Sequence, residues 1–377
     1  MTTIERADDL LVETVDKLLE EHATPERIGA AEGGLDRPLW DLLEASGLTL
    51  VGVPESRGGS GGTLHDFAAI AKAAGRHGAP VPLADSLTAA NTVGSLTTLD
   101  VPTGPLAYAA VSPDAKRVRV PWAGTADHVV LLTFGAPASP AAGSRPQGVG
   151  RPGEHRSEAA ERSPSVTASI NVVAQSDLVI TASGQNYPGE PWLEIDTTAI
   201  ATGTPVDAPL TYTDALAAGA LARALLMAGA CQRVAELSVQ YVMEREQFGK
   251  PIGKFQILQH YLAEMAGEAA AAEAAADNAI DVIASGADRG ECTDAIAAAK
   301  AYAGRSVGII NRLAHQIHGA IGYTDEHRLQ YWTRRLWAWR DEYGTETEWA
   351  AHFGRSLAAA GGAALWPRIT NWPPPMG

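Results

Sequence analysis

The residues best suited to binding chemistry lie in a short segment between two long helical patterns. Arg245 ends the first pattern, and Gln247-Phe248-Gly249 follows as a turn. The segment supplies a guanidinium, a side-chain amide and a glycine that permits a sharp bend. An anionic pyrophosphate group needs such a cation together with backbone donors that can come close to it. The segment is therefore a candidate contact site for a ligand that carries phosphate.

Two further segments repeat the combination of amides, aromatic rings and glycines. Phe255-Gln256 opens the next helical pattern, and a run from Gln316 to Tyr323 follows about sixty residues later. Taken alone, each feature has an ordinary structural explanation. An arginine flanked by two glutamates is often a solvated ion-pair cluster, and the glycines could simply end a helix. The signal comes from their joint occurrence at these spacings.

Together the three segments resemble the C-terminal domain of the acyl-CoA dehydrogenase family, the flavoenzymes that put a double bond between Cα and Cβ of an acyl thioester. In that family the Arg-x-x-Phe-Gly element, the Phe-Gln pair and the Gln-x-x-Gly-Gly-x-Gly turn contact the FAD of the neighbouring subunit. Alanine replaces one glycine of the turn here, a small departure unless the position requires a positive φ. The resemblance implies FAD as cofactor and these cofactor-binding residues: Arg245, Gln247, Phe248, Phe255, Gln256, Gln316, Gly319, Ala320 and, from a later Gly-Thr pair, Thr345.

The resemblance also implies a position for the catalytic base. Desaturation needs a base that takes the α proton while flavin N5 takes hydride from Cβ. Most members carry this base as a Glu in a Tyr-Glu-Gly-Thr turn, twenty residues after the aromatic residue of the glycine turn. Counting from Tyr323 gives Tyr343, and Gly344 and Thr345 then match the family's Gly-Thr. A phenol with a reference pKa of about 10 is a poor base at neutral pH, and Glu342, one residue away, points elsewhere on a regular backbone.

Other parts of the family's active site are also missing. Some members carry the base on the first long C-terminal helix, twenty-six residues before the arginine, and counting back from Arg245 gives Gly219. The family's Thr-Glu-Pro-x-x-Gly-Ser loop and Trp-Ile-Thr strand, which hold the flavin ring, have no recognisable counterpart. The elements that reach a neighbour's FAD are kept, while the base and the holders of the chain's own flavin ring are lost.

This pattern of loss resembles the non-catalytic partner in actinobacterial-type heteromeric acyl-CoA dehydrogenases of steroid and acyl-CoA catabolism. We expect a subunit of an FAD-dependent acyl-CoA dehydrogenase that pairs with a catalytic paralogue, as a heterodimer or α2β2 heterotetramer acting on an acyl-CoA. The resemblance implies electron-transfer flavoprotein as the electron acceptor. Two alternatives stay open: a self-sufficient homomeric dehydrogenase with Glu342 or Asp341 as a displaced base, and a family-derived scaffold that binds neither flavin nor acyl-CoA.

Three regions must position these residues. Helical spacing of apolar residues predicts an all-helical region at 1–102. Short apolar runs bounded by turn residues predict a small β domain at 103–210, and Ala- and Leu-rich patterns predict long helices at 211–377. The predicted fold is α+β and mainly α, with an N-terminal helical domain, a small middle β domain and a C-terminal four-helix bundle, which is the layout of acyl-CoA dehydrogenases.

The β domain contains a compositional outlier at 135–166. This segment is rich in Gly, Pro, Ser, Ala, Arg and Glu and has almost no large apolar residue. Such a composition predicts a long flexible insertion. A tolerated surface loop is favoured over a recruitment role, because long loops cost little free energy to add.

The charge and the cysteine content of the chain narrow the kinds of partner and the cellular compartment that we expect. The net charge of −15, from 44 acidic and 29 basic residues, argues against nucleic acid and anionic membranes as partners. Two distant cysteines without a Cys-x-x-Cys motif favour a reducing, cytoplasmic compartment. There is no apolar signal segment and no run of 18 apolar residues, so no membrane span is expected. His315 and His318 lie three residues apart without a third ligand, so no metal site is expected.

Overall fold

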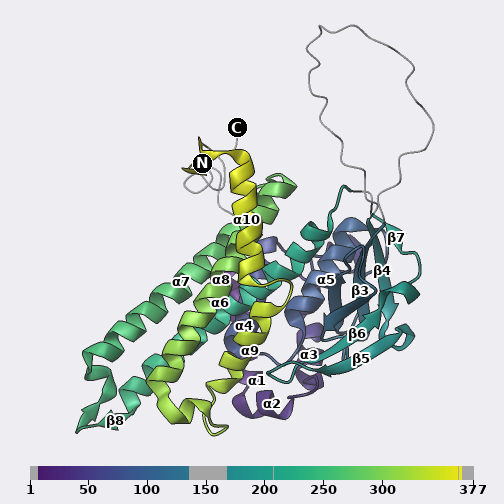
Figure 1. Ribbon diagram of the computed structural model, residues 1–377. Coiled ribbons are helices and arrows are strands. Elements are labelled where there is room, and N and C mark those ends of the chain that lie inside the picture. Colours follow the sequence, from purple (N-terminus) through teal and green to yellow (C-terminus); the bar gives the residue numbers. More distant parts are fainter. Residues whose placement is uncertain (1–6, 136–167, 207, 364, 367–377) are drawn as a thin grey trace, which may run out of the picture.

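The computed structural model arranges the chain as helices, then strands, then long helices (Figure 1). It describes residues 7–135, 168–206, 208–363 and 365–366. The predicted insertion at 135–166 therefore lies, from residue 136 onward, outside the described residues. In the described part the chain is mainly helical with a smaller sheet region, which confirms the predicted fold class.

Five helices form the N-terminal region: α1 (Asp9–His22), α2 (Pro25–Ala30), α3 (Arg37–Ala45), α4 (Leu64–His77) and α5 (Leu83–Leu96). The short α2 was not expected from the sequence. It begins where the Thr24 side chain accepts a hydrogen bond from the backbone of Arg27, with proline at its first position. The apolar stripes of α1 and α3 are buried in one core with α4 and α6.

The middle region holds two small sheets. Its strands are β1 (Leu106–Ala110), β2 (Arg117–Pro121), β3 (His128–Phe134), β4 (Ala168–Ala174), β5 (Ile180–Gln185), β6 (Pro191–Asp196) and β7 (Thr204–Pro205). One sheet has the order β1-β3-β4-β7 and the other β2-β6-β5, and only the β1–β3 pairing among them is parallel. One face of β1 packs against the second sheet through Ala107 and Ala109, and the other packs on α5 through Leu106 and Tyr108.

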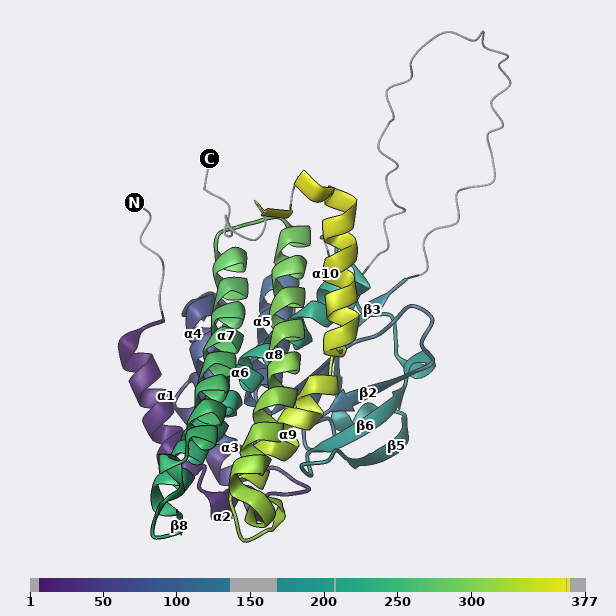
Figure 2. The same ribbon diagram turned by 60° about the vertical axis from the view of Figure 1, so that its left-hand side comes forward.

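The C-terminal region is built on three long helices, α6 (Tyr212–Glu244), α7 (Gln256–Ala284) and α8 (Arg289–His318), followed by α9 (Gln330–Asp341) and α10 (Glu346–Ala360). Figure 2 shows α7 and α8 side by side, with α1 on one side and the strands on the other. Helix α6 is the centre of the molecule and packs on α4, α5, α7, α8 and α9. By length and composition α6 could cross a membrane, but 83% of its most apolar window is buried inside the fold, as in a core helix.

Helices α4 and α6 cross with their backbones in contact. A Cβ atom added to Gly75 would lie 2.0 Å from the carbonyl oxygen of Leu226, and one added to Gly229 would lie 2.0 Å from that of Lys72. Only glycine permits such an approach. The N-terminal helices are therefore fitted closely to the bundle.

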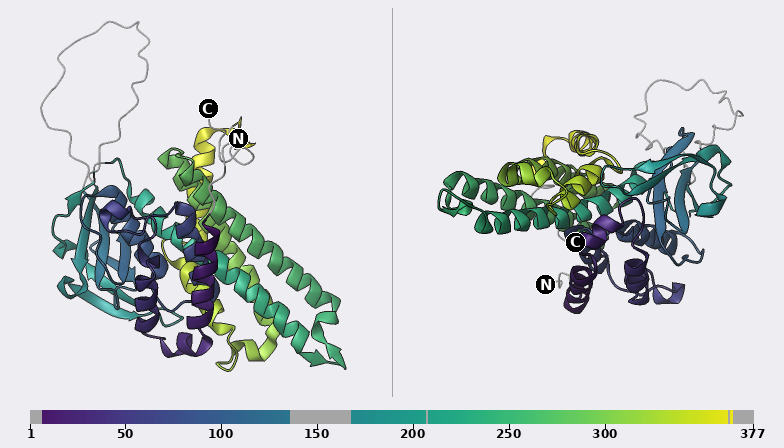
Figure 3. Two further views of the ribbon diagram at one scale, coloured as in Figure 1. Left: turned by 180° about the vertical axis from the view of Figure 1, so that it is seen from behind. Right: turned by 90° about the horizontal axis from the view of Figure 1, so that it is seen from below.

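The bundle has a free end that projects away from the β domain (Figures 1 and 3). This end carries the hairpin of β8 (Glu246–Gln247) and β9 (Lys250–Pro251), which joins α6 to α7. The turn that ends α8, at Gly319–Tyr323, belongs to the same end, where Tyr241 of α6 packs on His318. The opposite end of α6 packs against the β domain.

Candidate functional site

The structure places the sequence-predicted residues in two separate locations. Eight of the nine predicted cofactor-binding residues lie at the free end of the bundle, which we call the bundle-end cluster. It comprises Arg245, Gln247, Phe248, Phe255, Gln256, Gln316, Gly319 and Ala320. Thr345, together with Tyr343 and Glu342, lies instead where the bundle meets the β domain.

The hairpin of the bundle-end cluster has an unusual backbone. Phe248 and Gly249 both have positive φ, at 54° and 74°, between the paired strands β8 and β9. A two-residue hairpin loop of this type favours Asn and Gly. For phenylalanine the left-handed conformation costs about 1 kcal/mol or more, and the Phe248 side chain is nonetheless 90% exposed. Folding alone does not account for a strained and exposed aromatic residue at a hairpin tip.

Arg245 is exposed at the end of α6. Among the residues that the structure describes, its guanidinium has no ion-pair partner, and Glu244 instead accepts a hydrogen bond from Gln240 at 2.7 Å. The explanation of Arg245 as part of a solvated ion-pair cluster with its glutamate neighbours is therefore not supported. The side chain is free to meet a ligand or a partner.

The glycine turn is also open on its outer side. Gly319 ends α8 with φ 63°, and a Cβ atom there would meet nothing within 4 Å. Ala320 does not have a positive φ, so the replacement of a family glycine by alanine costs nothing at this position. On the inner side a Cβ atom at Gly322 would lie 2.9 Å from His318. The turn thus packs tightly on the bundle and leaves its outer backbone accessible.

Neutral aromatic rings support this turn from below. The His318 ring stacks on Tyr241 at 4.4 Å, and His315 stacks on Tyr323 at 4.2 Å. Burial lowers the pKa of His318 to about 4, so the ring is uncharged at neutral pH. No group of three metal-ligating side chains occurs in the described ranges. His315 and His318 are packing residues of this end of the bundle.

Large apolar side chains are exposed around the bundle-end cluster. Large apolar side chains that are exposed in one part of a folded protein often mark a site covered by a partner. We call this surface the bundle-end patch, and it consists of Val239, Met243, Phe248, Ile257, Ile321 and Tyr323.

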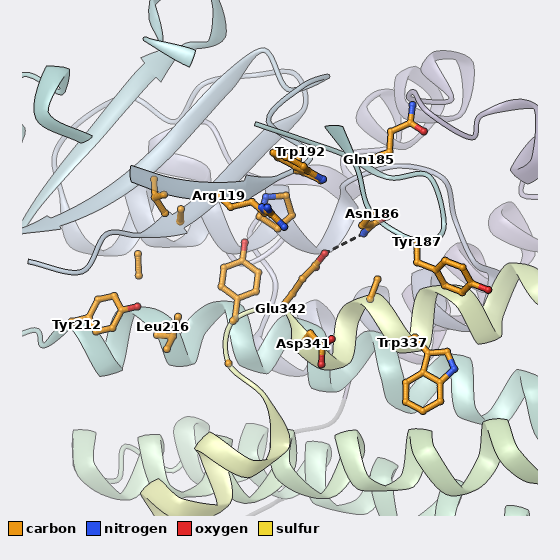
Figure 4. A pocket seen from close by; sticks show the side chains of 17 residues that line it. Arg119, Gln185, Asn186, Tyr187, Trp192, Tyr212, Leu216, Trp337, Asp341 and Glu342 are labelled. Atoms are coloured by element: carbon orange, nitrogen blue, oxygen red, sulfur yellow. Dashed lines mark hydrogen bonds between the residues drawn. The ribbon is translucent and has the colours of Figure 1, made fainter. Parts of the chain in front are cut away.

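The second location is a cavity of about 640 Å³ between the β domain, α6 and the turn after α9, which we call the interdomain cavity (Figure 4). Aromatic side chains provide much of its wall: Tyr187, Trp192, Tyr212 and Trp337. The Arg119 guanidinium lies 4.0 Å above the Trp192 ring. A cavity of this size with apolar walls and a few polar groups has the character of a small-molecule site.

Tyr343 closes one side of the interdomain cavity. An added Cβ atom at Gly219 would lie 2.3 Å from Cδ1 of the tyrosine, so the ring lies directly over this glycine. Its hydroxyl donates to the carbonyl oxygen of Tyr108 at 2.7 Å and lies 3.3 Å from Asp85 Oδ1. Burial raises the pKa of Tyr343 well above its ordinary value. The two base positions inferred from the sequence, Gly219 and Tyr343, thus lie against each other, and neither side chain is a base.

The expectation that Glu342 points away from this location is wrong. It assumed a regular backbone, but Tyr343 has φ 55° and Gly344 φ 92°, so the chain turns sharply here. As a result Glu342, Tyr343 and Asp341 all line the interdomain cavity. Figure 4 shows the Glu342 carboxylate directed towards Asn186, whose Nδ2 donates to it at 3.2 Å.

Arg223 of α6 holds the Glu342 carboxylate from the other side. Its Nε donates to Glu342 Oε2 at 2.5 Å, and its two terminal nitrogens donate to Asp85 of α5 at 2.9 and 2.8 Å. Arg223 and Asp85 are fully buried. One guanidinium therefore joins α5, α6 and the turn after α9.

The hydrogen-bond network continues from Glu342 into the β domain. It contains more carboxylates than guanidiniums. Asn186 donates to Glu190 at 2.9 Å, and Glu190 lies 3.3 Å from the buried Arg335 of α9. The three carboxylates Asp85, Glu190 and Glu342 thus face two guanidiniums. Burial raises the pKa of Glu342 to about 7, against the opposing effect of Arg223. Burial therefore favours the protonated form of Glu342, although its side chain is still 17% exposed.

Two further residues fix the turn. Lys300 of α8 is buried and donates from Nζ to the carbonyl oxygens of Trp339, Arg340 and Gly344, at 3.1, 2.6 and 2.9 Å. Thr345 caps α10, and its Oγ1 accepts a hydrogen bond from the backbone nitrogen of Glu348 at 3.3 Å. The sequence motifs did not mark Asp85, Arg223 or Lys300. The signal that could have found them is a charged residue inside an apolar helical run, which must have a partner when buried.

Comparison with known proteins identifies the class of enzyme to which this helix–strand–helix chain belongs. The family model for the acyl-CoA dehydrogenase N-terminal domain matches residues 6–100, and that for the C-terminal domain matches residues 211–346. Since these two models together cover more than half of the sequence, the chain belongs to the acyl-CoA dehydrogenase family.

Individual relatives extend over nearly the whole chain. Acyl-CoA dehydrogenase IpdE2 of Mycolicibacterium smegmatis is 29% identical over 343 residues, which are 87% of this chain and 91% of that protein. The solved structure of the Tcur3481-Tcur3483 steroid ACAD G363A variant aligns with a TM-score of 0.73 and 22% identity, covering 94% of this chain and 98% of that one. The ChsE4-ChsE5 complex from Mycobacterium tuberculosis aligns with a TM-score of 0.72 and 20% identity, with the same coverage.

Proposed function

We propose that this chain is the non-catalytic subunit of a heteromeric acyl-CoA dehydrogenase and contributes contacts in trans to FAD held by a catalytic paralogue. The observation that carries the proposal is the packing of Tyr343 on Gly219. This packing leaves both positions of the family's base without a group that could accept the α proton. The base must then come from the partner subunit.

The bundle-end cluster fits the requirements of FAD. The exposed Arg245 guanidinium offers a charge-assisted hydrogen bond to a pyrophosphate oxygen. The exposed amides of Gln247, Gln256 and Gln316 add donors, and the open backbone at Gly319 lets a ligand approach closely. When bound, FAD supplies the hydride acceptor of the reaction. The residues of this chain would bind and orient it.

The bundle-end patch supports a protein partner at the same location, because it would bury apolar surface on assembly. Of the similar solved structures, one is a complex of ChsE4 with ChsE5 and another is the steroid ACAD Tcur3481-Tcur3483. By family resemblance, the heteromer would act on an acyl-CoA substrate. Electron-transfer flavoprotein would then accept the electrons from its FAD. The absence of a paired-cysteine motif supports the cytoplasm as its compartment.

A second candidate function has a specific observation in its favour. Glu342 lines the interdomain cavity with a pKa of about 7, which suits a general base at neutral pH. A self-sufficient homomeric dehydrogenase would use this carboxylate. The contacts of Glu342 weigh against it, because both carboxylate oxygens already accept hydrogen bonds, one from Arg223 and one from Asn186.

Purification separates the candidates. The chain would be expressed alone and together with a paralogue that carries the family's Glu, and each product assayed by flavin absorbance, mass and acyl-CoA oxidation. We expect a colourless chain alone and a yellow, active heteromer. A yellow and active homomer would favour the Glu342 enzyme. A chain that stays colourless and unpaired with every paralogue would favour a scaffold.

A further inference from the structure

A second charged cavity, of about 380 Å³, lies where the N-terminal helices meet the bundle and shares no residue with the interdomain cavity. In the view from behind (Figure 3), the purple helix α1 lies against the helical region. The cavity is bounded by the α1–α2 junction, the end of α4, the middle of α6 and the segment that opens α9. Its lining residues are Asp16, Glu20, Ala23, Thr24, Pro25, Arg76, His77, Arg233, Arg328 and Trp332.

Two of its three arginines share one carboxylate. Arg76 donates to Glu236 at 2.7 Å, and Arg233 lies 3.5 Å from the other oxygen of the same side chain. Asp16, the second nearby carboxylate, is engaged by His77 at 2.7 Å and lies 3.8 Å from Arg76. The acidic groups around Arg76 are therefore already in use.

Arg328 contributes positive charge that is not neutralised. One of its terminal nitrogens donates to the amide oxygen of Gln240 at 2.7 Å, and across the described ranges it makes no ion pair. Burial lowers the pKa of Arg328, and the positive charge of Arg233 lowers it further, against Glu244. Arg233 and Arg328 thus lie close enough to repel each other, and Glu244 offsets this repulsion only in part.

Arg233 adds an unsatisfied donor. Its Nε is buried and has no hydrogen-bond acceptor among the protein atoms that the structure describes. Such groups are rare in folded proteins because each costs free energy. The side chain is held in place by Trp332, whose ring lies 5.6 Å from the guanidinium and whose Nε1 donates to the carbonyl oxygen of Arg76. The Arg233 guanidinium is therefore fixed at the wall of the cavity.

We propose that this cavity binds a small phosphate-type oxyanion, held by Arg328 and Arg233 with Arg76 at its edge. Planar guanidinium groups match the oxygen spacing of phosphate and bind it through paired hydrogen bonds. The anion would supply the missing negative charge and join α1, α4, α6 and α9 at one point. Two lining carboxylates, Asp16 and Glu20, oppose the anion; Asp16 is paired with His77, whereas Glu20 makes no ion pair within the described ranges.

The test is the binding of inorganic phosphate to the full chain in a chloride buffer, measured by isothermal titration calorimetry and thermal melting. We expect one site per chain and a melting temperature that rises with phosphate, because a ligand of the folded state stabilises it. Arg328→Gln should weaken binding at least tenfold. Glu20→Gln should tighten it severalfold by removing the repulsion. Arg37→Gln, in an exposed pair with Asp41, is the matched control and should change nothing.

Free phosphate and the phosphate ester of a larger ligand present the same chemistry. A titration with glycerol 3-phosphate distinguishes these two sources. If the cavity binds both inorganic phosphate and glycerol 3-phosphate, the site accepts phosphate esters. If it binds inorganic phosphate alone, the site is specific for the free anion. Absence of binding at phosphate concentrations on the order of 10 mM, well above a Kd of about 1 mM, would overturn the proposal. Unchanged binding in both Arg328→Gln and Glu20→Gln would overturn it as well, and the second variant keeps the test decisive if the first fails to fold.

Discussion

Tyr343 and Glu342 are adjacent in the chain and line one cavity, but their polar groups have different surroundings. The phenol donates to the carbonyl oxygen of Tyr108, and the carboxylate faces the interdomain cavity between Arg223 and Asn186. A residue that takes part in proton transfer must be able to lose or gain a proton near the working pH. Glu342 satisfies this condition and Tyr343 does not.

We predict that neither side chain is the base of the assembled enzyme. Tyr343→Phe and Glu342→Gln should each leave kcat of the heteromer within about threefold, because the base belongs to the partner subunit. A threefold change in kcat corresponds to a change of less than about 1 kcal/mol in the activation free energy, since a factor of ten corresponds to about 1.4 kcal/mol. Steady-state kinetics on complexes of equal flavin content would measure this. A hundredfold loss of kcat in Glu342→Gln alone, with assembly intact, would instead establish Glu342 as a displaced base and overturn the non-catalytic assignment.

Arg245 provides the most direct test of the cross-subunit contact. Arg245→Ala removes a charge-assisted hydrogen bond to phosphate, worth roughly 1.5–3 kcal/mol. FAD affinity of the assembled complex should therefore fall roughly ten- to a hundredfold, as measured by flavin fluorescence on titration. Arg117→Ala, an exposed arginine on β2 paired with Glu194, is the control and should leave it unchanged. Equal affinity in both variants would contradict the bundle-end site.

Among the elements, the β8–β9 hairpin combines strain with exposure. Phe248→Gly would remove the left-handed strain and its cost of about 1 kcal/mol. The isolated chain should therefore melt at the same or a slightly higher temperature, while its affinity for the catalytic partner falls at least tenfold because an apolar anchor is lost. Calorimetry on the chain and a binding titration with the partner would measure the two effects. A variant with unchanged partner affinity would remove the hairpin from the interface.

The segment 135–166 should be dispensable for folding. Its composition offers no apolar surface to bury, and the residues on either side, Phe134 and Ala168, are already cross-strand partners of β3 and β4. Replacement by a short Gly-Ser linker should shift the melting temperature by no more than about 2 °C, which corresponds to roughly 1.5 kcal/mol for a chain of this size. A fall of several degrees would show that the segment packs on the domain.

Most elements follow from sequence pattern, and the exceptions have physical reasons. The long periodic helices α6, α7 and α8 lie where the pattern predicts them, since their apolar faces are continuous. The short α2 depends on one cap, which periodicity does not detect. The predicted domain boundaries at 102 and 210 fall in the connections before β1 and α6, and they remain predictions. The motifs marked eight residues that the structure places together in the bundle-end cluster, and their contact with FAD remains a prediction. Asp85 and Arg223 lie too far apart in sequence to suggest a pair.

At the scale of the whole molecule, the buried network that joins the three regions gives stability a specific pH dependence. Glu342 has a pKa of about 7 in the folded chain, above its reference value of 4.5. Between these values the folded state holds a proton that the unfolded state has released, so stability falls as pH rises through this interval. The contribution is fully present below about pH 4.5 and is lost above about pH 7.

Glu342→Gln should remove that part of the pH dependence, because an amide cannot ionise. As the pH is raised from 5 to 8, we expect the melting temperature of the variant to rise relative to that of the parent. Titrating groups outside this buried network cancel in the difference between the two melting temperatures. Glu246→Gln, on the exposed hairpin, is the control and should give a curve parallel to the parent. Parallel curves for Glu342→Gln as well would place the excess proton elsewhere in the network.

The backbone contact between α4 and α6 has a consequence for synthesis on the ribosome. Gly75 of α4 packs against Leu226 of α6, and about 150 residues separate them in the chain. At 5–20 residues per second, α4 waits roughly 8–30 s for its partner after it has been made. During that time its apolar face has no α6 to cover it. The N-terminal helices therefore cannot complete their packing before α6 has been made, and a chaperone that binds nascent apolar helices could act on α4 during this interval.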